Sequence, residues 1–241
     1  MQVKILIFSF GSFPRENLLK DVPDVLYRDS LDYYRPYIQG LFWQYTKGNF
    51  TQTAYLDWTS RKTDDVRETF IMGGHGRYKH GLFFVDNFLY MYHYANKDEP
   101  DRRDPITVRD NGIIYLRLGG DFSKKTSLDS LSIGVAGIKS FERVRRFEDM
   151  ITCNGVNFEL TASYKDFQVS NTLYLGEGHD MDWGDPFYRL KSYNRSEISY
   201  TLLDYKRVNA KFSAILHFAE NKRHHHQLFT ITVDLNRRGT Y

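Results

Sequence analysis

The sequence has few of the features that mark several large classes of protein. Its 241 residues include one cysteine, Cys153, which excludes an internal disulfide and a cysteine-based metal cluster. No apolar run approaches the ~20 residues that a transmembrane helix needs. The 33 basic and 30 acidic residues give a net charge of only +3, so no nucleic-acid partner is indicated. Only six prolines are present to interrupt strands.

What the sequence does contain is repeated alternation of apolar and polar residues. In the segment 50–58 the even-numbered positions include Phe50, Leu56 and Trp58, while the odd-numbered positions include Thr51, Thr53 and Asp57. The same pattern recurs near 157–164, 210–218 and 227–235. Because side chains alternate across a strand, each segment has one apolar and one largely polar face. The chain is therefore predicted to be all-β.

The pattern predicts an antiparallel up-and-down β-barrel of about twelve strands, with a short helical insertion after the first strand. Short and long connections alternate, which places short turns at one rim and long loops at the other. A Greek-key sandwich does not keep this parity. The helical insertion is expected over Arg15–Leu19 and again near Leu26–Tyr34. The strands are expected near 2–11, 37–46, 49–60, 67–77, 81–95, 111–122, 130–144, 156–166, 168–178, 196–206, 209–220 and 226–236.

Two further predictions concern the barrel as a whole. Residues 1–241 are expected to form one domain, closed by pairing of segment 2–11 with segment 226–236, because an open edge in lipid leaves backbone donors unsatisfied. The apolar parity is expected to face outward, toward hydrocarbon. The residues that test this are Phe50, Leu56, Phe158, Leu160, Phe212, Leu216, Ile231 and Val233.

Several tracts resemble hairpins of bacterial outer-membrane β-barrel proteins of the porin-like kind. They are GLFWQYTKGNFTQTAYLDWTSR, GRYKHGLFFVD and FSAILHFAENKRHHHQLFTITVDL, and the resemblance extends over residues 37–236. It implies a protein of the bacterial outer membrane that has the lipid bilayer and small solutes as partners. The sequence carries no signal peptide, so we expect a mature or truncated form.

In such a barrel, the polar faces of neighbouring strands would line the lumen. The pore-lining candidates are Asp57, Arg67, His75, Arg77, Arg117, Glu159 and Lys211, and a long loop adds Arg189, Lys191 and Arg195. Charged rings in a lumen set solute selectivity, which predicts convergent basic residues and a weak preference for anions. An alternative that stays open is a cross-strand ion-pair ladder that fills the interior.

The residues single out no catalytic, cofactor-binding or metal site. Three aspartates in the loop 179–195 imitate a calcium spacing but lack the glutamate that completes such a loop. Three consecutive histidines at 224–226 would alternate between the two faces of a strand and cannot share one ion, and we expect them to form a solvated turn at 221–226. A Ser-His-Asp triad is recognised by geometry, which residue order does not give.

The sequence therefore favours a pore for small solutes that needs no cofactor, and two alternatives remain. One is a soluble β-sandwich that binds carbohydrate on aromatic platforms such as Trp43, Trp58 or Trp183. The other is a membrane hydrolase built on the same barrel, for which the sequence identifies no nucleophile.

Overall fold

The computed structural model describes residues 4–15, 18–19, 21–28, 30–95, 108–145, 149–220 and 222–233. Within these ranges most residues are extended, and helix is confined to α1 (Leu31–Tyr34) and the 3-10 turns η1 (Ser123–Lys125) and η2 (Pro186–Arg189). The strands are β1 (Lys4–Pro14), β2 (Tyr37–Lys47), β3 (Phe50–Ser60), β4 (Thr69–His80), β5 (Phe83–Tyr94), β6 (Arg109–Asp121), β7 (Ser130–Val144), β8 (Ile151–Tyr164), β9 (Phe167–Gly176), β10 (Ser192–Tyr205), β11 (Val208–Ala219) and β12 (Lys222–Val233).

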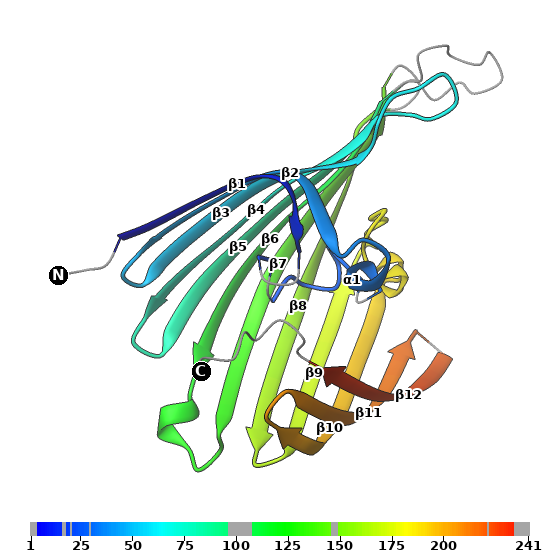
Figure 1. Ribbon diagram of the computed structural model, residues 1–241. Coiled ribbons are helices and arrows are strands. Elements are labelled where there is room, and N and C mark those ends of the chain that lie inside the picture. Colours follow the sequence, from blue (N-terminus) through cyan, green and yellow to red (C-terminus); the bar gives the residue numbers. More distant parts are fainter. Residues whose placement is uncertain are drawn as a thin grey trace.

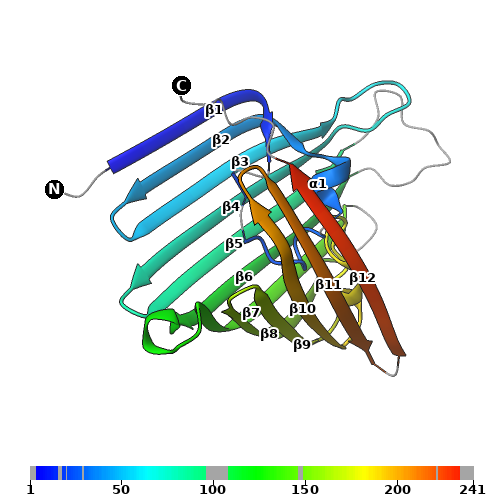
Figure 2. The ribbon, with the colours of Figure 1, turned by 60° about the horizontal axis from the view of Figure 1, so that its bottom comes forward.

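Each strand pairs antiparallel with its neighbours in the sequence, so the order across the sheet runs from β1 to β12. Figures 1 and 2 show one strongly curled sheet with β1 and β12 at its edges. The predicted all-β, up-and-down architecture is confirmed. The largest differences in strand bounds are early starts. β8 begins at Ile151 instead of 156, β10 at Ser192 instead of 196, and β12 at Lys222 instead of 226.

The connections alternate in length as predicted up to β11, but the last one is short instead of long, because β11 ends at Ala219 and β12 begins at Lys222. The hairpin turns at 48–49, 81–82, 122–129, 165–166 and 206–207 lie at one end of the sheet, which we call the short-turn rim. Gly48 and Gly81 have φ angles of 57° and 61°, a region in which a residue without Cβ is not strained. The longer connections lie at the opposite end, the long-loop rim. Outer-membrane barrels place short turns on the periplasmic side and longer loops outside.

The sheet is open between its first and last strands. Among the described residues β1 pairs with β2 alone and β12 with β11 alone. The predicted closure of segment 2–11 onto segment 226–236 is therefore not confirmed, and residues 2–3 and 234–236 lie outside the described ranges. Every residue of β12 is exposed, because within the described structure no neighbouring segment covers either face of this strand.

The predicted outward face of the sheet is confirmed. Leu160 is 39% exposed, and the same face carries Phe158, Phe212, Leu216, Ile231 and Val233 as exposed side chains. Phe50 and Leu56 lie on this face too but are half-buried. Because the register sets directly opposed residues on one face, apolar side chains form a belt around the outside of the curl.

The inner face packs against two connections that fold into the curl. Val25, Leu26 and Leu31 from the connection 15–36 are almost fully buried, as are Met181 and Tyr188 from the connection 177–191. Backbone hydrogen bonds join the two connections, from the amide of residue 28 to the carbonyl of residue 183 and from the amide of 185 to the carbonyl of 24. Figure 1 shows them side by side near α1. Together we call the described residues of 15–36 and 177–191 the plug.

The predicted helical insertion is present as α1, a single turn. The helix expected over Arg15–Leu19 includes residues 16 and 17, which lie outside the described ranges. None of the described helices is long and apolar enough to cross a membrane.

Candidate functional site

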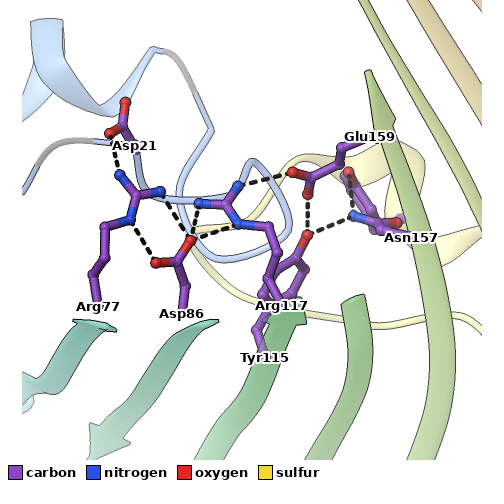
Figure 3. A network of polar contacts seen from close by, with 8 residues as sticks. Asp21, Arg77, Asp86, Tyr115, Arg117, Asn157 and Glu159 are labelled. Carbon is purple, nitrogen blue, oxygen red and sulfur yellow. Dashed lines mark hydrogen bonds and ion pairs between the residues drawn. The ribbon is translucent and has the colours of Figure 1, made fainter. Parts of the chain in front are cut away.

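A continuous network of charged and polar side chains crosses the inner face from β4 to β8 (Figure 3). Fully buried Asp86 accepts hydrogen bonds from Arg77 Nε at 2.6 Å and from Arg117 Nε at 2.8 Å. Arg117 Nη1 also donates to Glu159 at 2.8 Å, and the Tyr115 hydroxyl donates to the same carboxylate. These charges neutralise one another, which is the condition under which buried ions are tolerated.

Ion pairs tie the plug to the inner wall. Arg15 is almost fully buried and contacts Asp57, which also accepts a hydrogen bond from the Gln39 amide at 2.9 Å. The plug residues Asp21 and Asp24 pair with wall arginines. The pairs are Asp21–Arg77 at 3.6 Å and Asp24–Arg195 at 2.9 Å.

Other predicted pore-lining residues occupy separate places on the inner side. Arg67, at the long-loop rim, donates to the carbonyl of Ala95 at 3.3 Å. The His75 ring stacks on Phe88 with centroids 4.1 Å apart. Lys211 Nζ lies 3.9 Å from a Glu197 oxygen. The predicted convergence of four basic residues is therefore limited to Arg77 and Arg117, which meet at Asp86.

The predicted loop residues belong to the plug and to the strand end that supports it. Arg189 pairs with Asp180 at 2.7 Å, and both side chains are about half exposed. The backbone amide of Lys191 lies 3.4 Å from a Glu220 oxygen. Arg195, a β10 residue rather than a loop residue, contacts the plug through Asp24. The plug and these ion pairs fill much of the inner space, leaving a polar cavity of about 330 Å³ toward the short-turn rim.

The three spaced aspartates are also engaged separately. Asp182 accepts from Arg109 at 2.7 Å, and Asp185 caps η2 by accepting from the amide of Phe187 at 2.9 Å. Of the consecutive histidines, His224 and His226 share the inner parity with His217, while His225 lies opposite Leu216 on the outer face. The three histidines lie within β12 and alternate across it, so the expectation that they form a solvated turn at 221–226 is wrong.

One serine–histidine pair lies inside the curl. Ser140 Oγ on β7 is 2.7 Å from His179 Nδ1 in the plug, and the two residues are 5% and 1% exposed. Burial lowers the pKa of His179 to about 4, so this imidazole is neutral near pH 7. Its Nε2 atom is buried without a hydrogen-bond partner among the described residues. The pair has the chemistry of a nucleophile and base but no exposure to a membrane lipid.

A second histidine pair lies on the outer face at the long-loop rim. His93 on β5 and Asp110 on β6 are directly opposed in the register, and Nδ1 of the histidine is 2.8 Å from a carboxylate oxygen. Their side chains are 17% and 15% exposed. Arg145 donates from Nε to the other carboxylate oxygen at 2.8 Å. Phe70 packs on the imidazole, with ring centroids 4.7 Å apart.

This arrangement fixes the chemistry of the imidazole. A carboxylate beside Nδ1 holds the proton on that atom, which leaves Nε2 as the basic nitrogen. No described residue forms a hydrogen bond with Nε2 of His93. A partly exposed histidine that is oriented by a carboxylate is a suitable general base for an attacking water.

An apolar groove of about 410 Å³ lies on the same wall, below this pair. Met72, Leu89 and Ile114, which are 40 to 48% exposed, lie along it. Gly74 contributes no side chain to its floor, and Phe141 limits its upper end by lying over the glycine at 112. The register sets Met91 and Phe141 one outward position below His93 and Asp110.

Comparison with known families places the whole chain in one family. A family model described as "Lipid A 3'-O-deacylase-type" matches residues 1–237. The chain belongs to that family. No curated protein and no solved structure matches it significantly. Membership of this deacylase-type family, with the twelve-stranded sheet, fits a bacterial outer-membrane β-barrel protein whose partners include the lipid bilayer.

Membership of the deacylase-type family corrects the main functional prediction. A passive porin for small solutes is wrong, because the family is one of lipid A-modifying enzymes; the barrel-based hydrolase alternative agrees better. The structure gives a physical reason for the error. The main prediction treats the charged side chains on the polar face of the strands as the lining of a pore. In the structure these side chains pair with one another and with the plug.

Sequence reasoning missed His93 and Asp110. His93 lies in the tract YMYHY, which resembles an aromatic girdle, and Asp110 falls inside a segment interpreted as a long loop. The available signal was the unusual parity of His93, a polar residue on the apolar face of its strand. Its partner could be found only from the register between β5 and β6.

Proposed function

We propose that this protein is an outer-membrane hydrolase that removes an ester-linked acyl chain from a lipid A-type glycolipid, with His93 as general base and Asp110 as its positioning residue. The family match over residues 1–237 carries the proposal. The outward His93–Asp110 pair supports it, since it is the polar histidine pair that a lipid in the membrane can reach.

The position of the pair agrees with a substrate in the outer leaflet. His93 and Asp110 lie at the long-loop rim, the end that faces outside in barrels of this kind. The apolar belt extends below them toward the short-turn rim. An ester at the boundary between headgroup and hydrocarbon would therefore meet the imidazole from the membrane side.

The reaction follows from the geometry. His93 donates its Nδ1 proton in a hydrogen bond to Asp110, and Nε2 accepts a proton from water as the water oxygen attacks the ester carbonyl. Collapse of the tetrahedral intermediate breaks the bond between the carbonyl carbon and the sugar oxygen, and the imidazolium returns the proton to that oxygen. The products are a fatty acid and a free hydroxyl. Arg145 holds Asp110 in place through its other oxygen.

The interior pair Ser140–His179 is the competing site. A lipid would have to cross the wall and displace the plug to reach it, because both residues are almost fully buried. We therefore assign His179 a structural role that links the plug to β7. Its contribution can be separated from that of His93 by experiment.

The test is release of fatty acid from lipid A by the folded protein in vesicles, followed by mass spectrometry. His93→Gln and Asp110→Asn should lower the rate by ~10²-fold or more, the usual contribution of general base catalysis. His80→Gln is a matched control, since His80 is an exposed histidine at the short-turn end of β4. Ser140→Ala should leave the rate unchanged.

Each outcome bears on a separate part of the proposal. Release of no acyl chain by the wild-type protein would remove the hydrolase function. Loss of activity in Ser140→Ala, with His93→Gln still active, would move the reaction to the interior of the barrel.

A further inference from the structure

The outer wall carries a groove that the reaction chemistry does not require. Its side walls come from Met72, Leu89, Met91 and Ile114, and its depth comes from Gly74. A hollow of about 410 Å³ in the apolar belt forfeits packing contacts unless something occupies it. A second hollow, of about 460 Å³, lies beside Phe83, Val85 and Leu118 toward the short-turn rim, so what sets the first one apart is its place just below the reactive pair. The lining is almost entirely apolar, apart from Gln52 and Thr53.

We propose that this groove binds one acyl chain of the glycolipid substrate and so selects which ester meets His93. The inference rests on the proposed function for the identity of the lipid. Gly74 and Ala54, on adjacent strands, are then the specificity-determining positions, because any larger side chain at either one fills the groove.

The length of the groove is close to the thickness of one bilayer leaflet. Gln52 lies opposite Gly76, and Phe141 is level with Met72 through the register of β4 to β7. Residues 76 and 72 of one strand are separated by about 14 Å at the usual rise per residue. One leaflet of the hydrocarbon core is about 15 Å thick. The groove is therefore long enough for a chain that extends from the rim toward the bilayer centre.

The upper end of the groove lies one outward position below the reactive pair. On the outer face of β5, Met91 is two residues from His93. Gly112, which lies opposite Met91 on β6, is two residues from Asp110. A chain seated over Gly74, beside Leu89 and Met91, would hold its carboxyl end near the imidazole. Holding the ester in place in this way lowers the entropic cost of the attack by water.

Binding can be measured without hydrolysis. The probe is phosphatidylethanolamine with a diazirine near the end of one acyl chain, in vesicles of the same phospholipid that contain the His93→Gln protein. After irradiation, mass spectrometry locates the crosslinked peptides. We expect crosslinks to concentrate on peptides that contain Met72 and Met91, and added lipid A to displace them.

Two variants fill the groove, and a third is the matched control. Gly74→Leu and Ala54→Leu should each lower crosslinking there by about threefold, since between apolar surfaces in lipid only packing is lost. Gly137→Leu adds the same side chain on the same face of β7, outside the groove, where an added Cβ meets no atom within 4 Å. It should leave crosslinking unchanged. Migration of unheated protein in gels checks that each variant folds.

The outcomes separate this inference from the proposed function. Crosslinks spread evenly around the belt, or undiminished in both filled variants, would overturn the groove as a chain site. Concentrated crosslinks that lipid A fails to displace would overturn the glycolipid as its occupant. Concentrated and displaceable crosslinks, from a protein whose wild type releases no fatty acid, would support the groove and remove the hydrolase.

Discussion

The two faces of the sheet are formed by the same strands but differ in polarity and in exposure. The inner face buries charges such as Asp86, which is fully covered and shared by two arginines. The outer face presents Leu160 and its neighbours to hydrocarbon and places its polar pair, His93 and Asp110, only at the long-loop rim. The difference shows that the charges of the inner face support structure, whereas the outer face is mainly apolar and has few polar side chains, among them Asn171, opposite Leu160, and Ser196 beside it.

The largest expected effect is on the inner face. Asp86→Asn removes the charge that Arg77 and Arg117 share, and breaking a buried ion pair in this way costs roughly 3–5 kcal/mol of unfolding free energy. Urea unfolding in vesicles measures it. Asp121→Asn, which breaks an exposed pair with Lys79, should cost about 1 kcal/mol or less. Equal costs for the two variants would contradict the structural role of the inner network.

A smaller effect is expected on the outer face. Leu160→Arg places a charge in the apolar belt and should cost ~2–4 kcal/mol of folding stability in bilayers. Leu160→Phe keeps the surface apolar and serves as the control. If the arginine variant were as stable as the wild type in a bilayer, the outer face of β8 would not meet hydrocarbon.

The smallest effect concerns pH and the plug. Burial lowers the pKa of His179 to about 4 in the folded protein, below its usual value near 6.5, so the unfolded chain binds more protons between these values. The contribution of neutral His179 is complete above pH 6.5 and is lost as pH falls toward 4. Between pH 7 and pH 5 the folded state should lose ~2 kcal/mol.

Unfolding measured at these two pH values checks the prediction. His179→Gln should remove this part of the pH dependence, while His80→Gln, which changes an exposed histidine, should keep it. The same pH dependence in wild type and His179→Gln would show that the plug does not depend on a neutral histidine.

Much of the fold could be predicted because it depends on local pattern. Residues 50–60 alternate without interruption, and turns such as that at Gly48 contain residues suited to a left-handed backbone. β10 was placed four residues late because SYNR at its start has no apolar alternation. Pairing of the first and last strands was also predicted, but it depends on the curvature of the whole sheet, which no local pattern encodes.

The candidate site was harder to predict, because it combines residues whose neighbours are set by register. Arg77, Arg117 and Glu159 were selected correctly as inward residues from their parity. Asp86, the common partner of the two arginines, was not selected, and neither was Asp21 from the first connection. Parity assigns a residue to a face, but it does not identify the residue across from it.

The sequence by itself determined the strands, their order, and which side of each strand meets lipid, because a period of two residues is imposed by the geometry of an extended chain. The tertiary structure alone decided that residues 15–36 and 177–191 enter the curl and neutralise its charges. It also decided that His93 meets Asp110, and that Gly74 leaves a hollow in the belt. These contacts join residues far apart in the chain, and they form only when the register and curvature of twelve strands are set together.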